Sequence, residues 1–406
     1  MNRVVITGVG PVSNIGIGAR AFEQGLREGR VGVGPIRSFD TTGFPRTMAG
    51  EVRDFVPADL LRRLDVAAWG RSSLFAAAAA RLAVRDAGLD AALDAGALAP
   101  DRVGVVVGTT SGESKLTEEF GRRVVDAGFA AVDPALLAGL PAGRLAFAVN
   151  EELGVTGESV TLATACSASN YAIGYAYDAI AAGDAEVMLT GGADSVCRWA
   201  HAGFVRLGAV AETACAPFDL NRSGMVTAEG GAMLVLESAD HAAARGARPY
   251  AEVLGYALNC DASHMVAPNA ATIAACMRLA FDNAGISPSD VDYVCAHGTG
   301  TAANDATEAE ALFEAFDGKV PPVSSIKSML GHTMGAASAF GAIASAVAIA
   351  RGFLPPTVNW ASPDPAMSWL DPIPNRARPA PVRVAQNNGF AFGGNNAIVL
   401  LGGAPS

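Results

Sequence analysis

Short apolar runs alternate with long alanine-rich segments along almost the whole chain, and this alternation limits the possible folds more than any other feature. The short runs are rich in valine and largely apolar, which is typical of strands buried on both faces. The long segments have the length and composition of helices. Strands of this kind need helices on both sides of their sheet. The pattern therefore predicts an α/β fold.

The expected elements can be placed along the chain from this pattern. Strands are predicted at Val4–Thr7, Val103–Val107, Val160–Ala163, Val187–Thr190, Ala232–Leu236, Val291–Cys295, Val323–Ile326 and Ala397–Leu401, with a further strand around Ala251–Leu254. Helices are predicted at Ala67–Ala87, Ser169–Ala182, Ala270–Ala284, Asp305–Phe316 and Gly335–Ala350. Glycines mark the junctions, as expected where strands turn sharply into helices.

The two halves of the chain contain similar series of patterns. In each half a strand leads into a loop of glycine, threonine and serine, at residues 105–112 and 293–301. Further along, a strand leads through small residues into a helix, at residues 159–166 and 323–335. We interpret this as two similar α/β halves, residues 1–255 and 256–406, that share a central seam. Chance similarity between buried strands is the alternative.

The charge of the chain excludes some classes of partner. Charged residues make up only 17% of the chain, half of the residues are apolar, and 46 are glycine, which is the opposite of a disordered composition. The 29 basic and 40 acidic side chains give a net charge of −11. Nonspecific binding to nucleic acid or to anionic membranes needs basic faces. We therefore expect neither as a partner.

The cysteines and the apolar stretches indicate a cellular compartment. The six cysteines lie far apart and form no CxxC pair, which argues against a disulfide framework and a zinc site. The N-terminus has the pattern of a strand rather than of a signal peptide. The longest apolar stretch, Ala336 to Ala350, is 15 residues of mostly alanine, too short to span a bilayer. We expect a cytoplasmic protein with reduced thiols.

Cys166 is the candidate nucleophile. It follows a predicted strand at the point where the chain enters a helix, and its neighbours are small. Small neighbours allow a sharp turn and the close approach of a substrate, and the free N–H groups at the start of a helix stabilise a thiolate. A free cysteine is otherwise a common core residue, and we assign that role to the other five.

Two of the five histidines, His297 and His332, lie in glycine-rich segments directly after predicted strands. Together with Cys166 they could be metal ligands. Two neutral imidazoles could instead donate hydrogen bonds to one oxygen, as the chemistry of a thioester carbanion requires. We interpret His201 and His264 as structural and His241 as a surface residue.

Six segments resemble, in order and at similar spacing, the motifs of the elongating β-ketoacyl-acyl-carrier-protein synthases of the thiolase-fold superfamily. They are residues 4–10, 164–167, 217–230, 297–308, 325–332 and 389–394. The set Cys166, His297 and His332 is that of the elongating members, because priming synthases use Cys, His and Asn, and thiolases use two cysteines and one histidine. The resemblance implies a thiolase-like fold, in which two similar halves form a layered α-β-α-β-α body.

The resemblance also implies a reaction, decarboxylative Claisen condensation. Cys166 would take an acyl chain from an acyl carrier protein, with the backbone N–H groups of Cys166 and Phe392 as the oxyanion hole. His297 and His332 would donate hydrogen bonds to the thioester oxygen of malonyl-carrier protein while CO₂ is lost. The carbanion would then attack the acyl-cysteine and lengthen a fatty-acid or polyketide chain by two carbons.

Further residues take roles from the same resemblance. Lys327 is expected to orient the site through Glu308. The hydroxyls of Thr299 and Thr301 are expected to bind the pantetheine arm of the substrate. Phe390 and Phe392 lie among glycines, so a loop that closes the acyl pocket is expected there. An ordinary core position is an equally good interpretation for Phe390.

The implied partner is an acyl carrier protein. The carrier holds the phosphopantetheine arm, so no cofactor and no metal of the chain's own is expected. Because the carrier and this chain are both acidic, a local basic patch is needed for docking, and the candidates are Arg62, Arg63 and Arg206. A dimer is expected, either with a second copy or with a chain-length-factor-like subunit.

Two alternatives remain. A non-catalytic chain-length-factor-like subunit would lack a nucleophile, and Cys166 argues against it. A thiolase acting on CoA esters would need a second reactive cysteine, and no other cysteine has a matching setting. Departures from the family pattern, at Ala302-Ala303, Thr227-Ala228 and Asn395, put the substrate range in doubt. The motifs do not decide between fatty-acid and polyketide or polyene extension, but these departures favour a specialised type II assembly.

Overall fold

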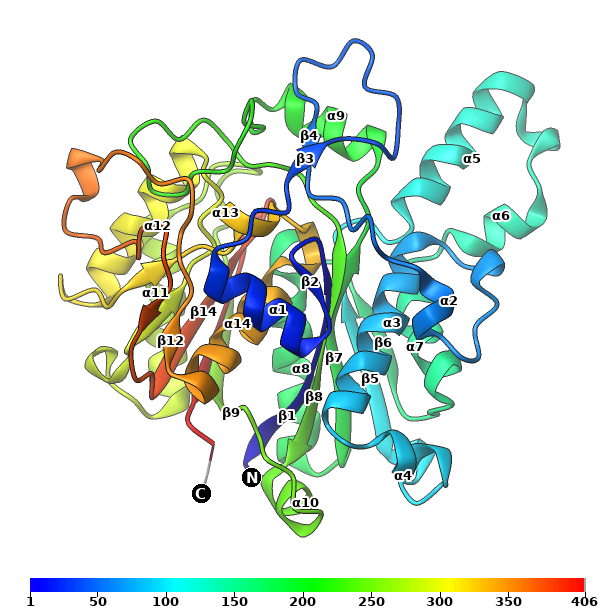
Figure 1. The fold of residues 1–406 in the computed structure, drawn as a ribbon, viewed down its shortest axis with the longest axis horizontal. Coiled ribbons are helices and arrows are strands. Elements are labelled where there is room, and N and C mark those ends of the chain that lie inside the picture. The colour runs from blue at the N-terminus through cyan, green and yellow to red at the C-terminus, as the bar shows by residue number, and fades with distance from the viewer. Residues whose placement is uncertain (405–406) are drawn as a thin grey trace.

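The computed structural model describes residues 1–404, which form a mixed β-sheet with helices on both faces (Figure 1). The strands of this sheet are β1 (Val4–Ser13), β2 (Gly16–Ile17), β5 (Val103–Gly108), β6 (Ser159–Leu162), β7 (Val187–Asp194), β8 (Gly230–Ser238), β9 (Ala251–Cys260), β10 (Tyr293–Cys295), β11 (Val323–Ser324), β14 (Val384–Phe390) and β15 (Asn395–Gly402). Two short pairs lie apart from it, β3 (Gly34–Pro35) with β4 (Met48–Ala49) and β12 (Phe353–Leu354) with β13 (Arg378–Pro379).

The helices are α1 (Ala19–Glu28), α2 (Pro57–Leu60), α3 (Arg71–Asp86), α4 (Asp90–Asp94), α5 (Ser114–Ala127), α6 (Pro134–Gly139), α7 (Arg144–Leu153), α8 (Ala168–Ala182), α9 (Arg198–Arg206), α10 (Ala239–Ala244), α11 (Ala270–Ala284), α12 (Ala302–Ala315), α13 (Lys327–Leu330) and α14 (Ala337–Arg351). Every predicted helix is present. The helix predicted from Ala67 begins instead at Arg71, because Gly70 interrupts the segment.

The order of the strands shows the internal repeat. The sheet runs β11-β10-β14-β15-β9-β1-β8-β7-β5-β6, with β2 beside β1. In the first half, β1, β8 and β7 are antiparallel neighbours and β7, β5 and β6 are parallel ones. In the second half, β9, β15 and β14 are antiparallel and β14, β10 and β11 are parallel. The prediction of two similar halves is therefore confirmed. The expected division at residue 255 falls inside β9, and the strand order places all of β9 in the second half.

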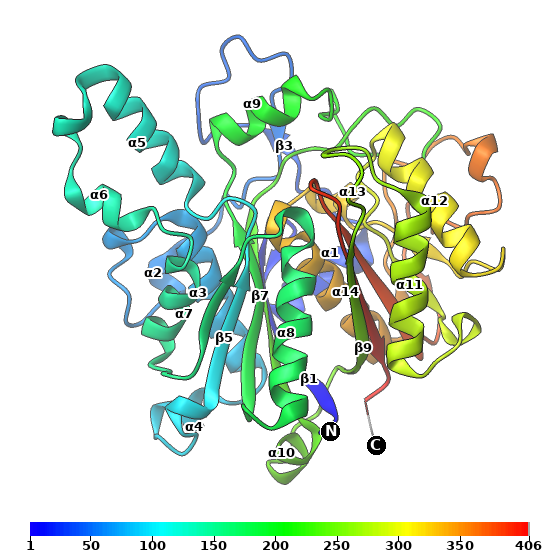
Figure 2. The ribbon, with the colours of Figure 1, turned by 180° about the vertical axis from the view of Figure 1, so that it is seen from behind.

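The helices form three layers around the two halves of the sheet (Figures 1 and 2). In the middle layer α8 packs on β5 and β7, α14 packs on β10 and β14, and the two helices contact each other. The helices α3 and α7 cover the outer face of the first half, and α11 and α12 cover that of the second. This is the layered α-β-α-β-α body that the sequence predicted.

Small residues allow the helices to approach the sheet closely. The side chains of Ala76–Ala80 on α3 are fully buried. A Cβ at Gly8 of β1 would lie 2.2 Å from the carbonyl oxygen of Ala83, and one at Gly10 would lie 1.9 Å from that of Ala79. Only glycine fits a strand at this distance from a helix backbone. The abundance of alanine and glycine is therefore a packing requirement of the layers.

One helical segment, Met334–Arg351, is long and apolar enough to cross a membrane by length and composition. It comprises the turn before α14 and α14 itself, and 83% of it is buried inside the protein. It is therefore a core helix, as expected from the sequence.

One end of the sheet is open. Strand β6 is the last strand in the order, and within residues 1–404 it pairs only with β5. Its residues are exposed or half-buried, whereas those of β5 and β7 are all buried. The helices α5 and α6 project from the body on this half of the molecule (Figure 2). The sequence did not predict this projection.

Candidate active site

Cys166 lies in a single turn of 3₁₀-helix, Ala165–Ser167, between β6 and α8. The preceding residue, Ala165, has a φ of 51°, a left-handed conformation that a non-glycine residue adopts at a cost. This bend turns the chain sharply from strand to helix and buries the side chain of Cys166, which is 5% exposed. The predicted position at a strand-to-helix turn is confirmed.

The environment of the thiol combines the expected stabilising N–H groups with a burial that the sequence did not predict. Burial raises the pKa of the Cys166 thiol to about 11, although the nearby Lys327 ammonium and the backbone N–H groups of Phe392 and Cys166 favour the thiolate. The start of a helix therefore does not suffice to ionise this cysteine. The same two N–H groups lie near the sulfur, on the side where the predicted oxyanion hole for a bound acyl group would form.

His332 follows α13 and is held by the backbone of a neighbouring loop. Its N–H donates to the carbonyl of Val226 at 2.7 Å, and its carbonyl accepts from the N–H of Ala228 at 2.9 Å. The N–H of Met334 donates to Nδ1 of the His332 ring at 3.2 Å. Because Nδ1 accepts this bond, the proton of the neutral ring lies on Nε2.

His297 follows β10, and its ring meets that of His332 edge to face with the centroids 5.5 Å apart. Burial and the charge of Lys327 hold the pKa values of both histidines well below the ordinary histidine value. Both rings are therefore neutral at neutral pH. The neutral state of both rings agrees with the interpretation that His297 and His332 donate hydrogen bonds to one oxygen, which was the alternative to metal binding.

Glu308 and Lys327 both act on the backbone of His297. The two carboxylate oxygens of Glu308 accept from the N–H groups of His297 and Gly298 at 2.8 and 2.7 Å. The ammonium of Lys327 donates to the carbonyl of His297 at 2.5 Å. Both side chains are buried. Within residues 1–404 they form no ion pair with each other, so each holds His297 directly rather than Lys327 acting through Glu308.

A cavity of about 80 Å³ joins six of the predicted catalytic and substrate-binding residues, but His297, Lys327 and Glu308 do not line it. Cys166 and His332 line it together with Thr299 and Thr301. The rest of the wall includes Phe204 of α9, Met225, Asn304 of α12, and Phe390 and Phe392 of the loop at residues 390–394. The hydroxyls of Thr299 and Thr301 are 2.9 Å apart. The nucleophile of the first half and a histidine of the second thus face one space.

The two phenylalanines have different surroundings. Phe390 ends β14, is 3% exposed, and packs on His297 and on the core of the second half. Phe392 is half-buried in the turn before β15 and lies against Phe204 of α9. The loop is tied to the 261–265 segment by bonds from the N–H of Gly393 to the carbonyl of Met265 and from the N–H of Asp261 to the carbonyl of Gly394. Phe392 is therefore the residue placed at the mouth of the cavity.

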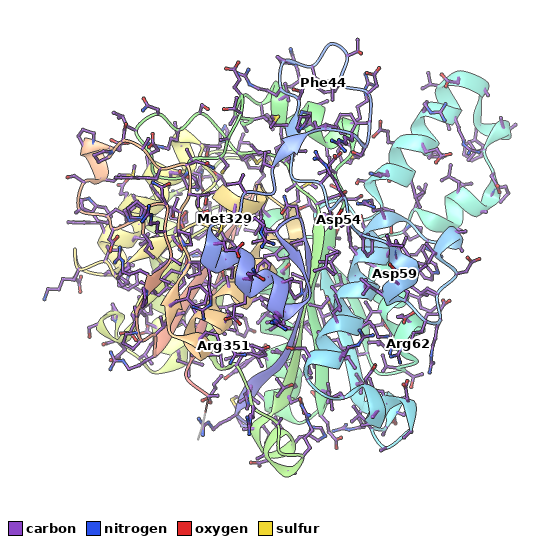
Figure 3. The ribbon with its side chains drawn as sticks, viewed as in Figure 1. Phe44, Asp54, Asp59, Arg62, Met329 and Arg351 are labelled. Carbon is purple, nitrogen blue, oxygen red and sulfur yellow. The ribbon has the colours of Figure 1, made fainter. Side chains whose placement is uncertain are left out.

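The three candidate docking arginines do not lie together. Arg206 ends α9, the helix that also contributes Phe204 to the cavity, and its side chain is exposed. Arg62 lies after α2, away from the seam (Figure 3), where it pairs with Asp90 and Asp94. Arg63 is next to Arg62 and exposed. Only Arg206 is close to the entrance.

Several residues of the site were not assigned a role from the sequence. Asp305 is buried and accepts from the N–H groups of Thr299, Gly300 and Phe218. Asn388 donates to Glu308 at 2.9 Å. Asp194 accepts hydrogen bonds from both halves of the chain. The signal that could have found Asp194 is a carboxylate at the end of a strand that is otherwise apolar.

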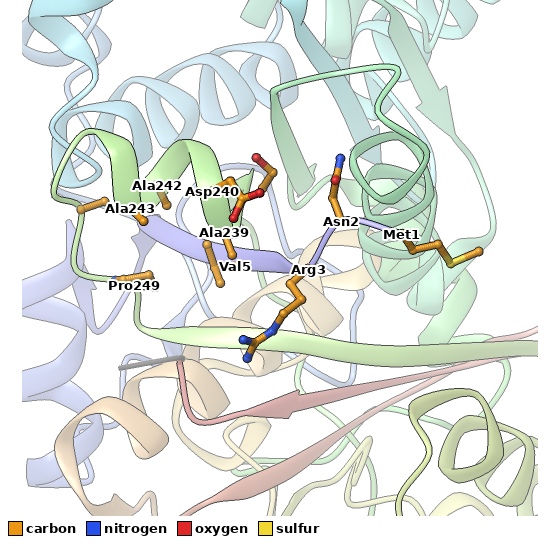
Figure 4. A pocket seen from close by; sticks show the side chains of 11 residues that line it. Met1, Asn2, Arg3, Val5, Ala239, Asp240, Ala242, Ala243 and Pro249 are labelled. Carbon is orange, nitrogen blue, oxygen red and sulfur yellow. The ribbon is translucent and has the colours of Figure 1, made fainter.

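Other features of the structure do not add to this site. In residues 1–404 no group of three His, Cys, Asp or Glu side chains is arranged to hold a metal ion. A larger cavity of about 490 Å³ lies at the N-terminus, lined by Met1, Asn2, Arg3, Asp240, Pro249 and neighbouring residues (Figure 4). None of the predicted site residues lies there.

Comparisons with known proteins cover nearly the whole chain. Residues 1–242 match the family model of the beta-ketoacyl synthase N-terminal domain, and residues 250–361 match that of the C-terminal domain. The 3-oxoacyl-[acyl-carrier-protein] synthase 2 of Synechocystis sp. is 36% identical over 98% of this chain and 97% of its own length. Nodulation protein E of Rhizobium meliloti is 39% identical over 98% of both chains.

Solved structures agree with these relatives. The structure described as the ishigamide ketosynthase/chain length factor is 46% identical, with a TM-score of 0.95 and full coverage of both chains. A type II PKS ketosynthase in complex with its acyl-carrier protein, AntDE:AntF, is 30% identical, with a TM-score of 0.90 and 99% coverage of both chains. The fold and the sequence therefore point to the same group of enzymes.

Proposed function

This chain belongs to the β-ketoacyl synthase family, and from that premise we propose that it is the catalytic ketosynthase subunit of a type II polyketide system. It is an acyltransferase that condenses an acyl-cysteine with malonyl-carrier protein and extends a chain by two carbons. The observation that carries the proposed mechanism is the shared cavity that brings Cys166 of the first half to His332 of the second.

In the first step the sulfur of Cys166 attacks the thioester carbonyl of the acyl-carrier protein. A bond forms between sulfur and the acyl carbon, and the carrier leaves as its free thiol. The developing oxyanion is stabilised by the N–H groups of Cys166 and Phe392, which lie near this sulfur. Because burial keeps the resting thiol protonated, its proton is lost as the attack proceeds and ends on the leaving thiol.

In the second step malonyl-carrier protein occupies the cavity. The bond between its terminal carboxylate and the adjacent carbon breaks, CO₂ leaves, and the electron pair places negative charge on the thioester oxygen. The Nε2–H of His332 donates to that oxygen, because Nδ1 already accepts from Met334. The neutral His297 ring beside it is the second donor. One such donor is worth roughly 3 kcal/mol in the transition state.

In the third step the carbanion attacks the carbonyl of the acyl-cysteine. A carbon–carbon bond forms, the carbon–sulfur bond breaks, and Cys166 leaves as thiolate and then takes a proton from solvent. Glu308 and Lys327 keep His297 in place during these steps by holding its N–H and carbonyl. The hydroxyls of Thr299 and Thr301 line the cavity, where they bind the amide groups of the pantetheine arm.

The carrier protein docks beside α9. Phe204 and Phe392 meet at the mouth of the cavity, and Arg206 is exposed two residues further along the same helix. An exposed cation here attracts an acidic carrier although the net charge of the chain is −11. Arg62 is not part of this patch, because its charge is paired with Asp90 and Asp94.

We further propose that the working enzyme is a cytoplasmic heterodimer with a chain-length-factor-like subunit. The support is the 46% identity to the ishigamide ketosynthase/chain length factor structure, which exceeds the 36% identity to 3-oxoacyl-[acyl-carrier-protein] synthase 2. Purification of the chain alone and after co-production with a chain-length factor, followed by native mass measurement, tests this. A stable homodimer that extends chains without the second subunit would exclude it.

The reaction is tested by following the mass of the intact protein. Incubation with acyl-carrier proteins should add one acyl group to the wild type and none to Cys166→Ala, whereas Cys260→Ala, which changes an exposed cysteine, should be acylated normally. Release of CO₂ from malonyl-carrier protein should fall about 100-fold in His297→Ala and in His332→Ala. An acyl adduct on Cys166→Ala, or undiminished release of CO₂ in both histidine variants, would contradict the mechanism.

A further inference from the structure

Asp194 is a fully buried carboxylate at the end of β7. In the described chain, residues 1–404, no basic side chain forms an ion pair with it. Its oxygens accept four hydrogen bonds instead, from the hydroxyl of Thr109 at 2.8 Å and from the N–H groups of Thr110 at 2.7 Å, Ser111 at 3.3 Å and Gly335 at 2.7 Å. Burying a carboxylate without a paired cation costs free energy, and these four hydrogen bonds offset that cost. The carboxylate in turn satisfies four donors that would otherwise be buried without a partner.

These donors come from both halves of the molecule. Thr109, Thr110 and Ser111 form the loop after β5 in the first half, and Gly335 belongs to the 3₁₀ turn Met334–Ala336 that precedes α14 in the second. The carboxylate therefore connects the two halves across the seam, at the start of the helix that follows His332.

Gly335 is held on its other sides as well. The hydroxyl of Ser169 on α8 donates to the carbonyl of Gly335. A Cβ at this position would lie 2.5 Å from backbone atoms of Thr109, so the turn is pressed against the loop after β5. With its N–H on Asp194 and its carbonyl on Ser169, Gly335 has both backbone polar groups fixed by side chains of the first half.

Met334, directly before Gly335, connects this anchor to the histidine. Its φ is 53°, a left-handed conformation that costs a non-glycine residue roughly 1–2 kcal/mol. Such a conformation persists only where the surroundings enforce it. In this conformation its N–H donates to Nδ1 of His332. If Gly335 were released, Met334 could relax, and the bond to Nδ1 would be lost.

We propose that Asp194 is a positioning residue for the decarboxylation step. By holding Gly335 it keeps the N–H of Met334 on Nδ1 of His332, so that the ring carries its proton on Nε2 and presents it to the thioester oxygen. The inference rests on the proposed role of His332 and extends it to a residue of the other half. Asp194 does not line the cavity, so it acts through His332 rather than on the substrate.

The test separates the two half-reactions. In Asp194→Ala, acylation of Cys166, followed by intact mass, should not be slower than in the wild type, because the charge of Asp194 raises the pKa of that thiol. CO₂ release from malonyl-carrier protein should fall at least about tenfold, because a donor to the thioester oxygen is mispositioned. Glu113→Ala is the matched control, because Glu113 is equally buried but accepts from the N–H groups of Ser72 and Ser73 on α3, which belong to the first half of the chain. It should lower the melting temperature without changing the ratio of the two rates.

A direct readout of the tautomer completes the test. In protein with ¹⁵N-labelled histidine, the His332 signals, identified by their loss in His332→Ala, should show a proton on Nε2 in the wild type and a mixture of tautomers in Asp194→Ala. If Asp194→Ala does not fold, Ser169→Ala, which removes the other anchor of Gly335, should give the same selective loss of CO₂ release.

Two results would overturn the inference. One is an unchanged rate of CO₂ release in the folded variant; the other is an equal fall in both half-reactions with the Nε2–H signal of His332 intact. If instead the wild type itself released no CO₂, the proposed function would be wrong, which is a different result from either of these.

Discussion

Cys166 and Gly335 occupy equivalent positions in the two halves of the molecule. Each follows a residue with left-handed backbone, Ala165 with a φ of 51° and Met334 with a φ of 53°, and each lies in a 3₁₀ turn that leads into a central helix. The two turns contact each other across the seam. The same local structure therefore presents a nucleophile in one half and fixes a histidine ring in the other.

Substitution of Gly335 should be costly even for the smallest side chain. In Gly335→Ala the new Cβ would lie 2.5 Å from the backbone of Thr109, which cannot move away easily. We expect a loss of roughly 1–3 kcal/mol in the free energy of unfolding, together with reduced CO₂ release. On α5, nothing lies within 4 Å of a Cβ added at Gly121, so Gly121→Ala should instead raise the free energy of unfolding by about 0.5–1 kcal/mol. Equal melting temperatures for the two variants would contradict this account of the turn.

The reactivity of Cys166 should rise with pH well beyond the range of an ordinary thiol. Burial raises its pKa to about 11, so the neutral thiol predominates at pH 7–9. Because the thiolate is the reactive form, alkylation by iodoacetamide should increase about tenfold per pH unit over that range, whereas an ordinary thiol of pKa about 8.5 levels off. The mass of the Cys166 peptide at timed intervals measures the rate. A plateau below pH 9 would show that the thiol is ionised more easily than its burial implies.

Removal of Lys327 should affect both the thiol and His297. Its ammonium lowers the pKa of the Cys166 thiol and donates to the carbonyl of His297. Lys327→Met should therefore raise that pKa further and slow alkylation at pH 9 by several-fold. CO₂ release should also fall, because the His297 carbonyl loses its partner. Alkylation at the wild-type rate would mean that the ammonium does not act on the sulfur.

Carrier docking should depend on Arg206 and not on Arg62. Arg206→Glu places a negative charge beside the mouth of the cavity, so KM for the acyl-carrier protein should rise about tenfold. Because salt screens exposed charges, the difference in KM between this variant and the wild type should shrink at high salt. Turnover at saturation should change little. Arg62→Glu is the matched control, since this arginine is already paired with Asp90 and Asp94. A larger effect from Arg62 than from Arg206 would place the docking surface on the α2 side.

The fold could be predicted from the sequence because its strands are apolar and its helices rich in alanine. The strand β14 was not predicted, since Gln386, Asn387 and Asn388 give it a polar pattern. In the structure all three amides are buried. Asn387 donates to Asn170 of α8 and Asn388 donates to Glu308, whereas the side-chain oxygen of Gln386 has no partner among the described residues. Partners so far apart in the chain leave no local signal in the strand itself.

A site residue could be predicted where its neighbours in the sequence indicate its role. Cys166 and His297 each follow a strand among small residues, whereas His332, which the sequence placed directly after a strand, follows the short helix α13. The role of Asp194 could not be predicted, because it depends on Gly335, 141 residues further along the chain. The stabilising effect of backbone N–H groups on the Cys166 thiolate was predicted, but burial outweighs it and raises the pKa of the thiol, because the sequence does not show how completely the thiol is buried.

The open edge at β6 has a practical consequence for producing the protein. Its unpaired N–H and C=O groups form a template to which any extended segment can add, which is how sheet edges cause aggregation. A chain synthesised without a subunit that pairs with this edge is therefore expected to aggregate more readily at high concentration. If the proposed partner subunit pairs with β6, solubility during recombinant expression should rise when the two chains are made at the same time.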